Sequence, residues 1–140
     1  MSVDGNKTVV LNGWASVSKN DLQGIRAMNA DDVVYHGSAG EEARRKENVL
    51  AMLSGYFSAF SEMRATVEDV FGEGDRVFTR VRLEGTNTGD LFGMPATGKR
   101  IAVNWVMNVA RLGDGKVVEE WEIFDRVDML TQLGHMPAEG

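Results

Sequence analysis

The stretch Leu112–Gly134 constrains the fold more than any other part of the sequence. Gly113-Asp114-Gly115 has the composition of a tight turn, and Lys116–Phe124 then alternates with the period of two that is typical of a strand. Asp125 is a candidate helix N-cap and Gly134 a candidate stop, so a short helix should follow the strand directly. A turn, a strand and a capped helix in one run fix where the two faces of the strand point.

The two faces of this strand differ in chemistry. One would carry Val117, Trp121 and Ile123, and the other Val118, Glu120, Glu122 and Phe124. On a half-buried face, desolvation and hydrogen bonds can hold a glutamate in a chosen protonation state, which suits general acid–base chemistry. The same pattern also fits an edge strand whose Glu120 and Glu122 form a solvated face, and the pattern alone leaves both interpretations open.

The rest of the chain has helical patterns first and strand patterns after them. Apolar spacing predicts helices within Thr8–Ser18, around Leu22 to Met28 and over Lys46–Phe60, with a short strand at Val33–Tyr35. From Ala65 onward the period changes to two, and Ile101–Arg111 is the longest predicted strand. This order indicates an α+β fold with a mostly antiparallel sheet.

Composition limits the kind of partner. A chain of 140 residues with 43% hydrophobic content fits one domain, residues 1–140. The net charge of -6 argues against nucleic acid and anionic membranes as partners and favours a neutral or apolar small molecule. The absence of cysteine excludes disulfides, thiolate metal sites and Cys nucleophiles. No signal-peptide pattern and no membrane-spanning apolar run appear, so we expect a cytoplasmic protein.

Both faces of the strand Ile101–Arg111 need cover. One would carry large apolar residues, namely Ile101, Val103, Trp105, Met107 and Val109, and the other small or amide residues, namely Ala102, Asn104, Val106, Asn108 and Ala110. The helices can cover only one face, so we expect a homodimer through the large apolar face. The alternative is a monomer whose sheet curls enough to hide both faces.

The hairpin before the last strand decides which polar residues meet. A three-residue loop, Gly113 to Gly115, would place Glu122 between Asn104 and Asn108. A two-residue Asp114-Gly115 turn would instead move Glu122 to the opposite face. We predict the three-residue loop because it keeps the large apolar residues of both strands together.

Three motifs resemble the SnoaL-type polyketide cyclases: Gly-Met-Pro-Ala-Thr-Gly at 93–98, the segment Leu112–Glu122, and Gln132-Leu133-Gly134. The resemblance covers nearly the whole chain, including the paired N-terminal helices. It implies a nuclear transport factor 2-like cone, in which helices pack in a strongly curved sheet around a deep pocket, commonly as a homodimer. It also implies a small apolar ligand, such as a polyketide, with no cofactor and no metal.

The resemblance also implies roles for single residues. In these cyclases a carboxylate acts as acid and base in an intramolecular aldol closure, and the matching position is Glu122, where the cyclases have Asp. A histidine of the cyclases falls on Asn108, which cannot exchange protons near neutral pH. Asn104 and Asn108 would orient the glutamate or stabilise an enolate. His36, the other candidate catalytic residue, would assist from the opposite wall, although a strand-end histidine can also simply bond to backbone.

Large side chains complete the expected site. The candidate substrate contacts are Trp14, Tyr35, Met52, Tyr56, Phe60 and Phe92. Most of them could equally be plain core, but Leu91, Phe92 and Met94 lie in a Gly-rich connection and are expected to cap the pocket mouth or a subunit contact. Alternative functions are a non-catalytic binding protein of the same fold, a cofactor-independent hydroxylase, or an isomerase or dehydratase if His36 and Glu122 face each other.

Overall fold

The helices and strands follow the predicted order, with one additional short strand, Glu42–Arg44, that the sequence pattern did not predict. The computed structural model describes residues 2–137; residues 1 and 138–140, which the predicted domain includes, lie outside them. The elements are α1 (Val3–Ser18), α2 (Leu22–Met28), β1 (Asn29–Gly37), β2 (Glu42–Arg44), α3 (Lys46–Ala59), β3 (Phe60–Glu73), β4 (Arg76–Asn87), β5 (Arg100–Gly113), β6 (Lys116–Ile123) and α4 (Arg126–Leu133). The α+β class is confirmed. The strand predicted to be the longest, β5, has 14 residues, as does β3.

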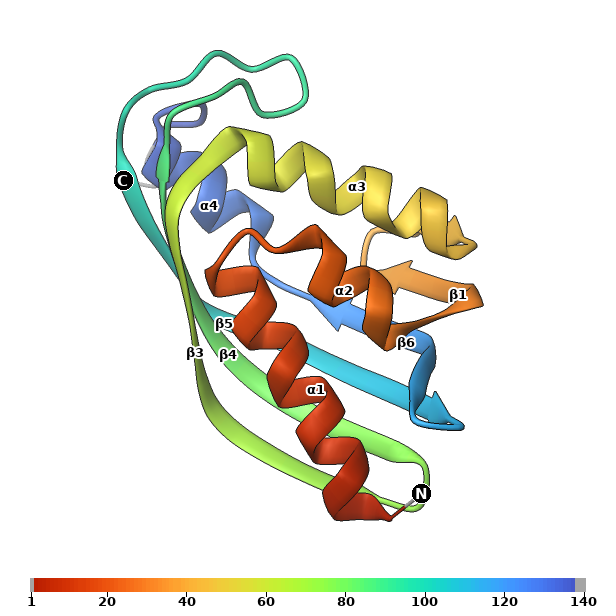
Figure 1. Cartoon of the computed structure of the whole chain (residues 1–140). Coiled ribbons are helices and arrows are strands. Elements are labelled where there is room, and N and C mark those ends of the chain that lie inside the picture. Colours follow the sequence, from red (N-terminus) through yellow and green to blue (C-terminus); the bar gives the residue numbers. More distant parts are fainter. Residues whose placement is uncertain (1, 138–140) are drawn as a thin grey trace.

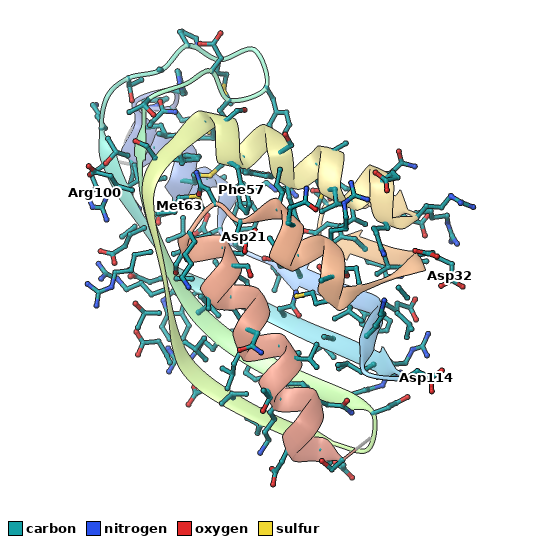
Figure 2. All side chains as sticks on the ribbon, in the orientation of Figure 1. Asp21, Asp32, Phe57, Met63, Arg100 and Asp114 are labelled. Carbon is teal, nitrogen blue, oxygen red and sulfur yellow. The ribbon has the colours of Figure 1, made fainter. Side chains whose placement is uncertain are left out.

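A six-stranded sheet forms the body of the protein. Its order is β2-β1-β6-β5-β4-β3, and only the β1–β6 pair is parallel. The sheet curls strongly, and α1, α2 and α3 lie on its concave side (Figure 1). The convex face has no helix over it in this view, and side chains such as Arg100 project from it into solvent (Figure 2). The mostly antiparallel, strongly curved sheet is therefore as predicted.

Helix caps explain where the closing helix begins and ends. Asp125 accepts a hydrogen bond from the backbone N–H of Asp128 at 2.9 Å, which satisfies a donor of the first turn. Gly134 ends α4 in the left-handed conformation with φ of 88°. Both predicted signals are confirmed. The side chain of Gln132 then fixes α4 to β5 by exchanging hydrogen bonds with the backbone of Ala102.

The hairpin between β5 and β6 differs from the prediction. Gly113 pairs with Lys116, and Asp114 and Gly115 both have positive φ, so the loop has two residues, not three. This is the conformation that Asp-Gly favours in two-residue hairpins. The predicted three-residue loop is wrong.

A bulge in β6 then restores the predicted face of the glutamates. Leu112 pairs with Val117, whereas Arg111 pairs with Glu119, so Val118 is an extra residue in β6. One extra residue turns every later side chain to the other face. Glu122 consequently pairs with Asn108 itself on the concave side.

A second bulge changes the faces of β5. Val103 pairs with Leu83 and Val106 with Val81, so Asn104-Trp105 stands opposite the single residue Arg82. The predicted unbroken alternation along Ile101–Arg111 is therefore wrong. Ile101 and Val103 belong to the buried core together with Val106, whereas Trp105 is 59% exposed on the convex face.

Candidate functional site

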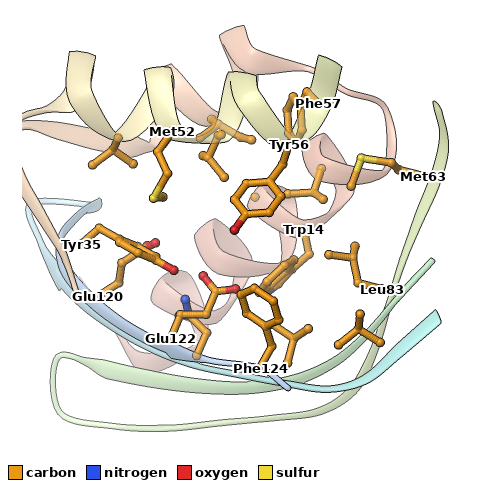
Figure 3. Close-up of a pocket in the computed structure, with 18 of the residues that line it drawn as sticks. Trp14, Tyr35, Met52, Tyr56, Phe57, Met63, Leu83, Glu120, Glu122 and Phe124 are labelled. Carbon is orange, nitrogen blue, oxygen red and sulfur yellow. The ribbon is translucent and has the colours of Figure 1, made fainter. Parts of the chain in front are cut away.

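An apolar cavity of about 150 Å³ lies between the concave face of the sheet and the helices α1, α2 and α3. Its walls are mainly aliphatic, methionine and aromatic side chains, which Figure 3 shows pointing inward from both sides. The polar side chains in its wall are few: Asn29, Tyr35, Tyr56, Glu84, Asn108, Glu120 and Glu122, with the indole N–H of Trp14. Among residues 2–137, no Lys, Arg or His lines it. Carboxyl groups and no cations face this apolar space.

Glu122 meets the predicted amide in this cavity. Its partner across the strand pair is Asn108, which is 5% exposed. Burial raises the pKa of Glu122 to about 7, while hydrogen bonds from Asn108 and Tyr35 act in the opposite direction by favouring the carboxylate. Such a pKa leaves a large fraction of the group as a base near neutral pH and lets the same group return a proton.

Glu120 is a second carboxyl on the same wall, and the predicted site did not include it. Burial first, and the charge of Glu122 second, raise the pKa of Glu120 to about 8. Both carboxyl groups keep some exposure, but this surface faces the cavity, so apolar walls set their environment. The spacing of two along β6 could have identified Glu120, because residues i and i+2 share a face.

Two tyrosines approach the carboxyl groups from other elements. Tyr35 on β1 stands opposite Glu120 in the parallel ladder, and its pKa is raised, mainly by burial and then by Glu122 and Glu120. Tyr56 points its hydroxyl from α3 toward the sheet (Figure 3), and burial followed by the charge of Glu122 raises its pKa as well. Both phenols therefore stay protonated and can donate hydrogen bonds.

Five of the six predicted substrate contacts line the cavity: Trp14, Tyr35, Met52, Tyr56 and Phe60. The indole of Trp14 is fixed by a hydrogen bond of 3.0 Å to the hydroxyl of Thr79 on β4. The wall also includes Met28, Met52, Met63 and Met129, whose flexible side chains can adapt to a ligand.

The sixth contact, Phe92, lies outside the cavity wall. It is 62% exposed and packs edge-on against Tyr56, with ring centroids 5.1 Å apart. Its neighbour Leu91 is buried in the core, and Met94 packs against that core. Phe92 therefore reaches the cavity through Tyr56, whereas Leu91 and Met94 pack against core residues that line it. The predicted position of Phe92 in the substrate-contacting wall is not observed.

His36 does not face Glu122. In β1 it follows Tyr35, and neighbouring residues of a strand point to opposite faces. The His36 ring lies on the convex side, where it stacks on Trp121 and its Nε2 is 2.8 Å from the carboxylate of Glu119. His36 therefore does not lie on the cavity wall opposite Glu122, where it was expected to assist.

Asn104 also lies away from Glu122. The bulge at Asn104-Trp105 turns it to the convex side, where its Oδ1 accepts a hydrogen bond of 3.0 Å from Arg82. Of the four predicted catalytic residues, the structure thus brings together Glu122 and Asn108, and it separates His36 and Asn104 from them. No group of three His, Cys, Asp or Glu side chains within residues 2–137 could hold a metal ion.

Comparison with protein families gives one match. The family model described as SnoaL-like polyketide cyclase matches residues 8–133. A comparison with curated proteins gives no match. None of the helices in the described part of the chain is long and apolar enough to span a membrane.

Solved structures match the fold over nearly the whole chain. AclR, a candidate hydroxylase from Streptomyces galilaeus, is 27% identical with a TM-score of 0.88, covering 99% of this chain and 87% of that one. IdmH, a candidate polyketide cyclase from Streptomyces antibioticus, is 32% identical with a TM-score of 0.78, covering 92% and 98%. An NTF2-like protein from Burkholderia pseudomallei, 20% identical with a TM-score of 0.77, covers 95% and 98% and supports the fold alone. The predicted nuclear transport factor 2-like fold is confirmed.

Proposed function

The chain belongs to the SnoaL-like polyketide cyclase family, and from this premise we propose that it is an acid–base enzyme that acts without a cofactor on an apolar carbonyl compound. The named example is an intramolecular aldol cyclisation. The observation that carries the proposal is Glu122, a carboxyl in an apolar cavity whose pKa is raised to about 7 and whose strand partner is Asn108. A base of this kind is matched to neutral pH.

The reaction would use one proton shuttle. The carboxylate of Glu122 removes a proton from the carbon next to a ligand carbonyl, and the resulting enolate is stabilised by N–H and O–H donors of Asn108 and Tyr35. The enolate carbon then bonds to a second carbonyl carbon of the same molecule. The alkoxide that forms takes the proton back from Glu122, so the step consumes neither water nor a redox partner.

A proton-abstraction probe tests this proposal without knowledge of the natural substrate. 5-Nitrobenzisoxazole opens when a base removes its ring C–H and the N–O bond breaks, which gives a coloured phenolate. We expect Glu122→Gln to lower the rate by about 10²-fold or more, since general bases contribute that much. In the wild-type protein the rate should rise as pH increases through about 7, because the carboxylate is the active form. Equal turnover by the variant and the wild type would remove Glu122 from this role.

A non-catalytic binding protein is the second candidate. It is favoured by the position of His36 on the convex side, because no histidine in the described part of the chain then lines the cavity. The same position argues against an isomerase or dehydratase that pairs His36 with Glu122. Binding of the probe with no acceleration in either protein would support the binding role. Hydroxylation remains an alternative on the strength of the likeness to AclR.

We further propose that the protein is a homodimer through the convex face of the sheet. Large apolar side chains of three strands lie there, with Trp105 at 59%, Phe71 at 58% and Ile123 at 54% exposure. A second copy would cover them, and burial on the order of 1,500 Å² is typical of stable dimers. The contact differs from the predicted one, because Ile101 and Val103 belong to the core and not to this face.

A further inference from the structure

Two acceptors of the cavity wall, the Glu120 carboxyl and the Oδ1 of Asn29, lack a donor among the described residues, and we infer that the ligand carries an ammonium group, seated beside Glu120 among aromatic rings. This inference deepens the proposed function, because it names the ligand of the same cavity as an apolar molecule with a basic amine. It concerns binding and not turnover, so it can fail while the role of Glu122 stands.

Glu120 is the carboxyl that lacks a donor. Glu122 has Asn108 and Tyr35 as hydrogen-bonding neighbours, whereas the influences on Glu120 are burial and the charge of Glu122, which both disfavour its carboxylate. A carboxyl group in an apolar wall gains most from a partner that brings both charge and N–H donors. An ammonium group brings both.

Asn29 supplies an independent sign of a missing donor. It lies in the wall of the same cavity and is 2% exposed. Its Nδ2 donates to the carbonyl of Ile25 at 2.9 Å, while its Oδ1 has no hydrogen-bond partner. Buried amide oxygens are rarely left without a donor. Because its Nδ2 is tied to helix α2, the Oδ1 is the part of this amide left to accept from a ligand.

The rest of the cavity suits a cation attached to an apolar body. The rings of Trp14, Tyr35 and Tyr56 line it, and aromatic faces attract ammonium groups when water is excluded. No lysine, arginine or histidine among the described residues competes for the carboxyl groups from the wall. Glu84, a third acid in the lining, already pairs with Arg82 at 3.1 Å. An anionic ligand would meet carboxyl groups with no compensating charge.

Three matched probes test the inference by isothermal titration calorimetry: 1-naphthylmethylamine, 1-naphthalenemethanol and 1-naphthoate. They share one ring system and carry a cation, a neutral hydroxyl and an anion. At about pH 8 the amine should bind the wild-type protein roughly tenfold or more tightly than the alcohol, since a hydrogen bond to a charged group contributes that much. The naphthoate should bind most weakly.

The pH dependence gives a second readout. The titratable groups that line the cavity with Glu120 are Glu122 on β6, Tyr35 on β1, Tyr56 on α3 and Glu84 on β4, and Arg126 on α4 is close enough for its charge to act on Tyr35. Because Glu120 must lose a proton to receive the ammonium, amine affinity should fall by up to about tenfold per pH unit below pH 8. Proton release should appear as a heat that depends on the buffer. The alcohol should show neither effect.

Glu120→Gln isolates the carboxyl responsible. This isosteric change should reduce amine affinity to that of the alcohol and leave alcohol binding within about threefold. Glu119→Gln, one residue away on the convex face, is the matched control and should keep the amine preference. If wild-type protein binds the amine no more tightly than the alcohol, including the case in which neither binds, the inference is wrong. An amine preference that survives Glu120→Gln would also overturn it.

Discussion

Glu119 and Glu120 are neighbours in β6, yet their environments move their pKa values in opposite directions. On the convex side, a hydrogen bond from His36 is the first cause, with Arg111 adding to it, and together they lower the pKa of Glu119. On the concave side, burial and Glu122 raise the pKa of Glu120. The strand therefore carries two different glutamates at adjacent positions. Glu119 is an ion-paired carboxylate on the convex side, and Glu120 is a carboxyl group in the cavity that tends to keep its proton. The difference lies in the availability of donors, because His36 and Arg111 donate to Glu119, whereas Asn108 and Tyr35 donate to Glu122 and not to Glu120.

The same contrast holds for the whole sheet. The convex face combines exposed aromatic rings with arginines, and Arg80 lies over Trp105 with 5.2 Å to the ring centroid. The concave face combines aromatic rings with acids. We therefore expect substitutions on the convex face to change subunit association, and substitutions on the concave face to change protonation and ligand binding.

The largest expected effect is on the convex face. Trp105→Glu would place two negative charges in the proposed dimer contact, one from each copy. Loss of a central aromatic contact typically costs about 2 kcal/mol or more per copy, so the dimer dissociation constant should rise roughly 10³-fold or more. Light scattering at micromolar concentration measures this. A wild-type mass near 15.4 kDa would itself contradict the dimer.

The next effect tests the concave face through stability. A carboxyl whose folded pKa lies above its unfolded value costs nothing at low pH, and destabilises the fold progressively as pH rises toward the folded pKa of about 8. Glu120→Gln removes this cost and should raise the free energy of unfolding by about 2–3 kcal/mol at pH 9, after allowance for partial exposure. At about pH 4 both proteins should be equally stable. Urea denaturation at the two pH values measures the difference.

Glu119→Gln is the opposite control for this experiment. The pKa of Glu119 is lowered, so its carboxylate stabilises the fold at neutral pH, and this stabilisation is lost as pH falls. The variant should therefore be less stable than wild type at neutral pH and similar at low pH. If Glu120→Gln showed no greater advantage at pH 9 than at pH 4, the contrast between the two glutamates would be wrong.

The smallest effect concerns the contact outside the cavity. Phe92→Ala removes an edge-on ring contact from Tyr56, and such contacts contribute about 0.5–1.5 kcal/mol. We expect binding of the naphthyl probes to weaken by about threefold, because Tyr56 would be less well held against the cavity. Fluorescence titration measures this. Unchanged binding together with a lower melting temperature would mean that Phe92 contributes ordinary packing only.

The sequence was sufficient for the order of elements and for the main polar pair. Periodicity located the helices and the strands other than the three-residue β2, and Asp125 and Gly134 marked the ends of α4. The period of two also put Glu120 and Glu122 on one face. In contrast, Tyr35 and His36 were both expected at the site, although adjacent strand residues cannot face the same cavity. Which one points inward depends on the pairing of β1 with β6, which no local pattern records.

The bulges could not be predicted for a similar reason. Val118 and Asn104-Trp105 have no glycine or other residue type that marks an extra residue in a strand. Each bulge is visible only as a shift in pairing with a neighbour. As a result, Asn104 was expected on the concave side and is found on the convex side. The prediction for Glu122 was correct in face although its loop was wrong, because the shorter turn and the bulge at Val118 compensate.

Because of this compensation, the face on which each β6 side chain lies depends on a count of residues, as the meaning of a codon depends on its reading frame. The two-residue turn and the extra Val118 act as a paired deletion and insertion, and residues after Val118 are in frame with the cavity only because both are present. If Val118 instead paired regularly with Arg111, with no bulge, the register would shift by one, so that Glu120 and Glu122 would face outward while Glu119, Trp121 and Ile123 would face the cavity. In this strand, a one-residue change of pairing can therefore exchange the chemistry of the two faces without replacing any of the side chains that carry it.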